Sequence, residues 1–328
     1  MNFSRKFRTN AVSGLFGLIG ALAATLALAQ AWPTRPVTVI WPYPPGGSAS
    51  EVKMRALYNE AARVLGQPFV WDYKPGASAR LGVIAVSKAP PDGHMLTFAT
   101  DTVLTVLPQA SASFTAQVDR DYAAVQMPFG IPLVVTGHPK LPFRDIKGWV
   151  AYAKANPGKL TFGSTGIGGT AHLSMERIAE ALGIQMLHVP YASSPFMPDL
   201  LNGTIDIMTF STTALTSQVN AGKLNGLAQA GPRRTAQLPN VPTLRDAGYD
   251  ISIETWNALV TSPGTPPEVI AKMNATLNAA QKAPEVAKLF AQDESLTFYN
   301  SPKEITEHIK AETLRVRPII QRMNLKFD

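Results

Sequence analysis

Two segments rich in glycine and hydroxyl side chains carry the clearest chemical signal in this sequence. The first reads Tyr-Pro-Pro-Gly-Gly-Ser at 43–48, and the second reads Gly-Ser-Thr-Gly-Ile-Gly-Gly-Thr at 163–170. Each follows a short apolar stretch and precedes a helical pattern, so each is expected to open a helix. The first turn of a helix offers unpaired backbone N–H groups and a partial positive charge, and glycine allows a ligand to approach closely. Two such loops predict a site for a molecule with a carboxylate at one or both ends. For either loop alone, a tight turn with an N-cap is the alternative.

The second segment also contains the residue types of a hydrolase triad. Ser164, His172 and Asp206 are a nucleophile, a base and an acid by type, but Phe162 stands where the motif Gly-x-Ser-x-Gly needs its first glycine. We expect His172 to be structural or to contact a ligand. Asp206 lies between two isoleucines in an expected strand. Two roles stay open for it: it fixes a loop by accepting backbone N–H bonds, or it contacts an amino or hydroxyl group of the ligand.

Composition and spacing exclude several other kinds of site. The 328 residues contain no cysteine, and the five histidines lack the spacing of a catalytic metal site. The glycines at 163–169 do not have the spacing of a dinucleotide-binding loop. Three basic residues near the N-terminus contribute to the net charge of +7, which leaves +4 on the rest of the chain. Because no block of lysine and arginine remains, we expect no nucleic-acid partner, and we also expect no metal and no cofactor.

Residues 1–31 have the layout of a secretory signal peptide. Arg5, Lys6 and Arg8 precede an uncharged stretch from 11 to 28, and small residues around Ala29 and Ala31 supply a cleavage site. A membrane anchor is the competing interpretation, since about 18 apolar residues nearly span a bilayer. We favour the signal peptide, which predicts a soluble mature protein in the periplasm.

The rest of the chain alternates strand and helix patterns, and it does so twice in the same order. Each half predicts a strand, a glycine- and serine-rich loop, a helix, a strand, a second helix, a turn ending in glycine and a further strand. Such alternation is typical of mostly parallel sheets covered by helices. The expected elements cover 37–41, 54–65, 69–73, 78–88 and 94–99 in the first half, and 160–162, 175–182, 184–189, 198–201 and 205–210 in the second.

Two such units predict an α/β fold of two domains around a central cleft. Ligands of open α/β sheets bind beyond the carboxyl ends of the strands, and both glycine-rich segments fall at that position. We therefore expect the loops to face each other. The predicted division is a discontinuous domain 1, of residues 32–131 plus 254–328, and a domain 2 of residues 132–253. Trp256 lies near the return crossing and packs either on the cleft or hinge or in a core, and a final helix near 303–323 completes domain 1.

Six short motifs lie in order along the mature chain. They are Tyr-Pro-Pro-Gly-Gly-Ser at 43–48, Lys-Pro-Gly-Ala at 74–77, Pro-Asp-Gly at 91–93, Phe-Gly-Ser-Thr-Gly at 162–166 with His172 and Leu173, His-Val-Pro-Tyr at 188–191, and Leu-Pro-Asn-Val-Pro-Thr at 238–243 with Ala247 and Gly248. In this order the chain resembles the Bug-type extracytoplasmic solute receptors of tripartite tricarboxylate transporters.

The resemblance implies a periplasmic-binding-protein-like fold of type II, a Venus flytrap with its ligand between two α/β domains. It implies a small carboxylate ligand, held by backbone amides and ordered water, and delivery to the membrane permease subunits of a tripartite tricarboxylate transporter. We expect a monomer that is not an enzyme. Two alternatives are a periplasmic hydrolase that uses Ser164 and His172, and a receptor that presents its ligand to a sensor protein.

The candidate ligand-binding residues lie in the loops and at the strand ends. The sequence departs from the family motifs where Ala49 and Ser50 replace Thr-Asp, and where Arg80 replaces asparagine. Loss of an aspartate and gain of Arg80 favour a more anionic ligand if Arg80 points inward. The full set of candidates is Tyr43, Gly46, Gly47, Ser48, Ser50, Arg80, Thr100, Asp101, Ser164, Thr165, Gly168, Thr170, His172, Tyr191, Asp206 and Ser211.

Overall fold

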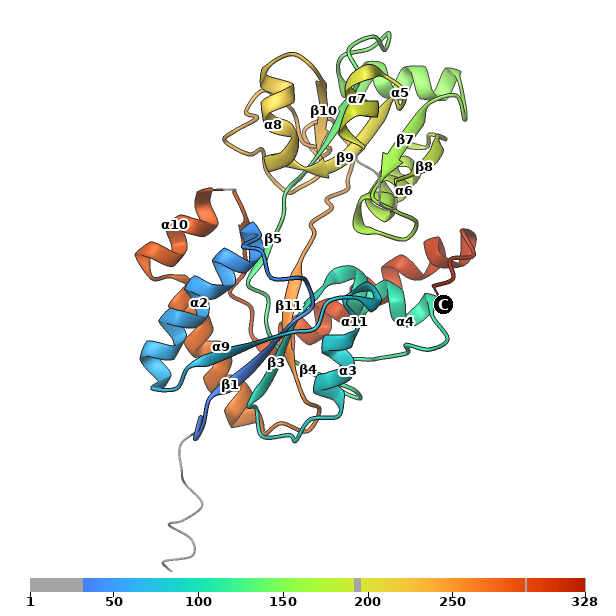
Figure 1. The fold of residues 1–328 in the computed structure, drawn as a ribbon. Coiled ribbons are helices and arrows are strands. Elements are labelled where there is room, and N and C mark those ends of the chain that lie inside the picture. The colour runs from blue at the N-terminus through green and yellow to red at the C-terminus, as the bar shows by residue number, and fades with distance from the viewer. Residues whose placement is uncertain (1–31, 192–195, 293, 328) are drawn as a thin grey trace, which may run out of the picture.

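The computed structural model describes residues 32–191, 196–292 and 294–327, so the predicted signal peptide lies outside the described residues. Two five-stranded sheets lie one above the other in Figure 1, and helices flank each of them. A short pair, β5 (Phe129–Gly130) with β12 (Leu296–Thr297), lies where the chain leaves the first sheet for the second. Among the described residues, no helix is both long and apolar enough to cross a bilayer. The prediction of two α/β domains is confirmed.

The first sheet has the strand order β2-β1-β3-β11-β4. Its strands are β1 (Val37–Trp41), β2 (Phe69–Tyr73), β3 (Met95–Thr100), β4 (Ala123–Gln126) and β11 (Asn257–Thr261). The apolar run of β1 is almost wholly buried because helices cover both faces of the sheet. One face packs on α2 (Ala49–Leu65), α9 (Pro267–Gln281) and α10 (Pro284–Gln292), and the other on α3 (Leu81–Ser87), α4 (Leu107–Ala110) and α11 (Pro302–Arg322).

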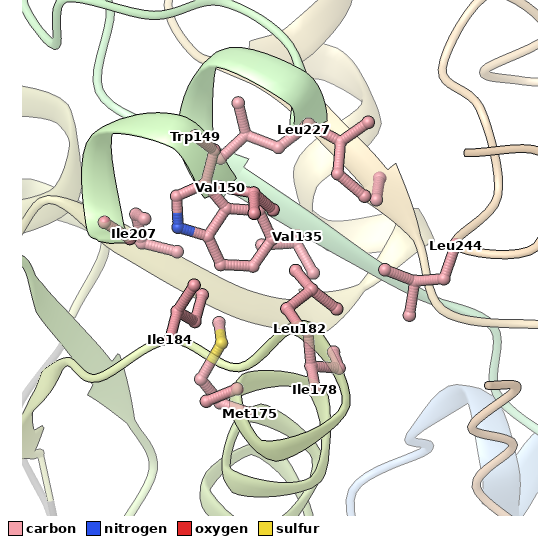
Figure 2. Close-up of a cluster of buried hydrophobic side chains, with 14 of the residues drawn as sticks. Val135, Trp149, Val150, Met175, Ile178, Leu182, Ile184, Ile207, Leu227 and Leu244 are labelled. Atoms are coloured by element: carbon pink, nitrogen blue, oxygen red, sulfur yellow. The ribbon is translucent and has the colours of Figure 1, made fainter. Parts of the chain in front are cut away.

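The second sheet has the order β10-β6-β9-β7-β8. Its strands are β6 (Leu133–Gly137), β7 (Thr161–Ser164), β8 (Leu187–Pro190), β9 (Ile207–Ser211) and β10 (Asn225–Gln229). One face packs on α5 (Ile146–Ala155) and α6 (Thr170–Leu182), and the other on α7 (Met197–Asn202) and α8 (Thr212–Asn220). Figure 2 shows the first of these interfaces, where Trp149 of α5 and Met175 of α6 belong to one buried cluster with Val135 and Ile207 of the sheet.

The two sheets repeat one connectivity, as the repeated sequence pattern predicts. In the first sheet β1 lies between β2 and β3, and in the second β7 lies between β8 and β9. Beside β3 and beside β9 lies a strand that arrives from the other sheet, which is β11 in the first sheet and β6 in the second. Those crossing strands, β11 and β6, pair antiparallel with their neighbours on both sides. They enter at the end of the sheet where the other strands finish, so they run in the opposite direction. Four of the five strands in each sheet therefore run in the same direction, so the sheets are mostly parallel as expected, and each contains one antiparallel crossing strand.

The segment expected as one helix over 78–88 is divided in the structure. A short 3-10 turn, η1 (Ala77–Ala79), precedes α3, and its three residues have positive φ angles of 47° to 66°. An α-helix cannot continue through left-handed residues, so the helix starts only at Leu81. The bounds of the other expected elements lie within five residues of the observed ones, and the largest differences are at the starts of α2 and α6. The C-cap of α6 is Gly183, with a φ of 63°.

Candidate functional site

A cavity of about 310 Å³ lies between the two sheets, where the strands β3 and β9 end. Residues from both halves line it, and no lysine, arginine or histidine of the described chain is among them. Thr100 and Asp101 follow β3, and Ser211 ends β9. The remaining walls are formed by Ile131, Leu133, Thr165, Thr170, Ala171, Phe210, Thr255, Trp256 and Asn257. The predicted candidates that the structure brings together here are Thr100, Asp101, Thr165, Thr170 and Ser211.

The N-terminus of α6 opens onto this cavity without a side-chain cap. Its N-cap residue is Gly169, and no side chain of the described residues accepts a hydrogen bond from the first turn. Thr170 and Ala171, the first two residues of the helix, both line the cavity. The free N–H groups and the helix dipole make this end of the cavity electropositive although no cationic side chain is present.

Asp101 faces the same cavity and links the two halves of the molecule. One carboxylate oxygen, Oδ1, accepts hydrogen bonds from the backbone N–H of Thr102 at 2.6 Å and from the hydroxyl of Thr170 at 3.2 Å. Burial raises the pKa of Asp101 to about 6, against the lowering effect of those hydrogen bonds. The carboxylate is therefore mostly ionised at pH 7.

The first glycine-rich loop has an anion of its own. The carboxylate of Glu51 accepts the backbone N–H groups of Gly46 at 3.3 Å and Gly47 at 3.1 Å. Ser48 caps α2 through the N–H of Glu51, and neither Ser48 nor Ser50 lines the cavity. The prediction that this loop offers free amides to a ligand is thus wrong for its two glycines, because a neighbouring carboxylate occupies them.

Arg80 does not point into the cavity. Its guanidinium donates hydrogen bonds to the hydroxyls of Ser111, at 3.2 Å, and Ser113, at 3.3 Å. Arg80 is not among the residues that line the cavity, whereas Asp101 is. The expectation of a more anionic ligand required an inward Arg80, and this condition is not met, although Ser50 still stands where the family motif has an aspartate.

The two candidate tyrosines lie outside the cavity lining. Burial, followed by the charge of Asp101, raises the pKa of Tyr43 to about 12. Tyr191 donates a hydrogen bond from its hydroxyl to Asp199 at 2.7 Å, and its backbone N–H donates to Ser164 at 2.8 Å. Tyr191 thus holds the start of the second glycine-rich loop through the backbone of Ser164.

A pair of stacked imidazoles supports the second glycine-rich loop. The rings of His172 and His188 lie 3.6 Å apart at an angle of 12°. His172 accepts the backbone N–H of Gly168 through Nδ1 at 2.9 Å, and Ser164 bonds to Nε2 of His188 at 2.7 Å. Burial lowers the pKa of both histidines to about 4, so both are neutral at pH 7. His172 is 1% exposed, which places it under the loop and not at the ligand surface.

The geometry does not support a hydrolase built on Ser164 and His172. Ser164 is fully buried, and its hydroxyl is engaged by His188 and by the backbone of Gly166. A nucleophile needs access to its substrate as well as a base. The serine instead closes the turn that leads from β7 to α6.

Asp206 lies at the opposite end of the second sheet from the cavity. It immediately precedes β9, and its carboxylate accepts hydrogen bonds from the N–H of Thr161 at 2.8 Å and from the hydroxyl of Thr161 at 2.9 Å. Thr161 begins β7, so the aspartate joins the starts of two neighbouring parallel strands. Of the two roles left open for Asp206, the structure supports the acceptance of a backbone N–H bond and not a contact with the ligand, because the cavity adjoins the ends of these strands and not their starts.

Sequence reasoning missed much of the apolar wall. Ile131 and Leu133 lie where the chain first crosses between the sheets, and Thr255 to Asn257 lie where it returns. Trp256 fulfils both roles that were considered for it: it lines the cavity, and it packs in the core of the first domain at 2% exposure. The signal that could have found the others is their position at the two crossings, where side chains necessarily border the cleft.

A larger hollow of about 600 Å³ lies between the segment 231–239 and helix α10. None of the predicted site residues lines it, and neither does any residue of the glycine-rich segments at 43–48 and 163–170. The smaller cavity, at the strand ends and at the uncapped helix, is therefore the better candidate for the ligand site.

Comparison with known proteins decides the family. The model of the tripartite tricarboxylate transporter family receptor matches residues 53–325. The chain belongs to this receptor family. The receptor is 33% identical over 322 residues to the UPF0065 protein in the tcbD-tcbE intergenic region of Pseudomonas sp. (strain P51), covering 96% of the receptor and 95% of that protein. It is 30% identical over 330 residues to protein BugT of Bordetella pertussis, covering all of both chains.

A solved structure gives the same answer for the fold. The periplasmic binding protein BugD is 25% identical to the receptor, with a TM-score of 0.69 over 90% of the receptor and 99% of the BugD chain. The resemblance to Bug-type receptors and the periplasmic-binding-protein fold are both confirmed. The family model describes a receptor and BugD is a periplasmic binding protein, which agrees with the buried state of Ser164.

Proposed function

We propose that this receptor is exported through its N-terminal signal peptide, captures a small carboxylate in the interdomain cavity and delivers it to the permease of a tripartite tricarboxylate transporter. The division into residues 32–131 plus 254–328 and residues 132–253, and the monomeric state, belong to the same proposal. The family of the chain and the periplasmic neighbour support delivery and export.

The observation that carries the proposal is the uncapped N-terminus of α6. Where α2 begins, Ser48 caps the helix by accepting the N–H of Glu51, and the carboxylate of Glu51 accepts the N–H groups of the two glycines that precede the cap. Where α6 begins, Gly169 has no side chain to cap the helix, and the first two residues of the helix line the cavity. A carboxylate bound there accepts backbone hydrogen bonds and interacts favourably with the helix dipole.

The test is a thermal-shift screen of small carboxylates, followed by calorimetry on the compounds that bind. A ligand at 100 times its dissociation constant should stabilise the receptor by about 2.7 kcal/mol. We expect Thr165→Glu to weaken binding at least about tenfold, because an anionic side chain then stands at the carboxylate site. Thr165 is exposed, so the fold should tolerate the change.

Thr115→Glu is the matched control, since Thr115 is also exposed and lines none of the cavities described. It should leave the affinity within about twofold. A receptor that no carboxylate stabilises, or equal affinities in the two variants, would contradict the proposal.

A further inference from the structure

The cavity proposed to hold a carboxylate contains a carboxylate of the protein. Only one oxygen of Asp101 is engaged: Oδ1 accepts from Thr102 and Thr170, and no hydrogen bond from the described residues reaches Oδ2. No basic side chain of the described chain lines this cavity to neutralise it. The site thus places the anionic Asp101, at the end of β3, beside the uncapped start of α6, where Thr170 donates to its Oδ1.

The cationic side chain beside Asp101 is already paired with another carboxylate. Arg177 lies in a small adjoining hollow that Asp101 also lines, and its guanidinium pairs with Glu312 at 3.5 Å. Glu312 and Tyr43 are the other titratable groups whose charges interact with Asp101. Neither donates a hydrogen bond to Oδ2, so the aspartate lacks a strong donor on its open side.

We propose that Asp101 selects carboxylates that carry an ammonium or hydroxyl donor beside an apolar body. The inference rests on the proposed function, because the carboxylate of the ligand is placed at the start of α6. A donor on the ligand supplies what Oδ2 lacks, whereas a second carboxylate there meets like charge in a partly buried site. The apolar body follows from the rest of the wall, where Ile131, Leu133, Phe210 and Trp256 offer no charge.

The ligand class can be tested with two series in which only one substituent changes. The first is 3-phenylpropionate, phenyllactate and phenylalanine; the second is 4-methylpentanoate, 2-hydroxy-4-methylpentanoate and leucine. In each series the α-substituent is hydrogen, hydroxyl or ammonium. By calorimetry at pH 7.5 we expect the ammonium or hydroxyl compound to bind at least about tenfold more tightly than the unsubstituted acid, since hydrogen bonds to charged groups are the stronger ones.

Asp101→Asn is the decisive variant. Its amide oxygen can still accept the N–H of Thr102, while its amide nitrogen replaces Oδ2 with a donor. We expect the preference for the ammonium compound to disappear in this variant. The unsubstituted acid should bind to the variant at least as tightly as it binds to the wild-type receptor. Thr165→Val is the control: it lines the same cavity and should change the affinity for all three compounds of a series by a similar factor.

Each outcome is decisive. If the wild-type receptor binds carboxylates but shows no preference within a series, or binds other carboxylates and neither series, the inference falls and the proposed function stands. If Asp101→Asn melts as wild type does but keeps the ammonium preference, the inference also falls. If no carboxylate of any kind binds, the proposed function fails with it.

Discussion

At the scale of single residues, Glu51 determines what the first glycine-rich loop can do. Its carboxylate is 2% exposed and accepts hydrogen bonds from Gly46, Gly47, Arg55 and Tyr73. The hydrogen bond from the hydroxyl of Tyr73 is the main cause that lowers the pKa of Glu51 to about 2. Arg55 and the glycine amides lower this pKa further, and burial opposes them. A loop that is satisfied internally contributes stability and leaves ligand capture to the other loop.

Glu51→Gln should therefore destabilise the receptor by about 1–3 kcal/mol at pH 7, because a charged acceptor for Arg55 and Tyr73 is lost. The native pKa lies below that of the unfolded chain, so the contribution is present above about pH 4.5 and is lost as the pH falls toward about 2. Denaturant unfolding at a series of pH values measures this difference.

Glu60→Gln, on the same helix, is the control for Glu51. Glu60 pairs with Arg63 at the surface, where water screens the pair, so its loss should cost much less stability than the loss of Glu51. Equal effects of the two substitutions would show that the Glu51 cluster contributes no more than a surface pair does.

Residue types and spacing predicted part of the site, and the limits of that prediction have a physical cause. Thr100, Asp101, Thr165, Thr170 and Ser211 were found because they follow strands that must end at the cleft. Arg80 and Asp206 were misplaced because their directions depend on partners 31 and 45 residues away. Hydrogen bonds between distant segments leave no mark on local sequence.

At the scale of elements, the repeated order of strands and helices was predictable because apolar runs and glycine stops mark each element. The direction of β6 and β11 was not, since a strand reads the same in either direction. The loop between β7 and α6 shows a further limit: Gly168 has a φ of 72°, and a Cβ there would lie 2.0 Å from Cζ of Phe327. The sequence shows the glycine but not the ring that packs on it.

Gly168→Ala should destabilise the receptor by about 2–4 kcal/mol, from backbone strain together with overpacking against Phe327. Gly158→Ala is the matched control: its φ is 71° but no atom lies within 4 Å of the added Cβ, so only about 1 kcal/mol is expected. Both values come from denaturant unfolding.

In a Phe327→Ala background the cost of Gly168→Ala should fall toward that of Gly158→Ala. Such non-additivity is the signature of direct contact. An unchanged cost in that background would show that the strain lies in the loop alone.

At the scale of the whole molecule, α11 of the first domain packs on α6 of the second. Arg177 and Glu312 form a mostly buried pair between them, with side chains 15% and 11% exposed, and Arg315 also bonds to Glu312. Arg322 reaches Glu176 and Glu180 from the end of α11 and is 48% exposed. The two domains are thus held together on one side of the ligand cavity by ion pairs of very different burial.

Arg177→Met should cost about 2–4 kcal/mol, because Glu312 then keeps only part of its compensation in a buried place. Arg322→Ala should cost less than about 1 kcal/mol, because exposed pairs are screened by water and salt. Unfolding by urea measures both. A larger loss for Arg322→Ala than for Arg177→Met would mean that the rim of this contact, and not its buried part, holds the domains together.

The crossing strand β11 has a consequence for how this protein is made. It inserts between β3 and β4, and the residues just before it close the ligand cavity. Until residues 255–261 leave the ribosome, β3 and β4 have open edges and the cavity lacks one wall. The first domain therefore cannot complete its fold during most of synthesis, although its early strands are already present. Under the proposed export, a chain that stays incomplete for so long remains a substrate for a machinery that threads unfolded polypeptides, and its fold closes only when its last quarter has been made.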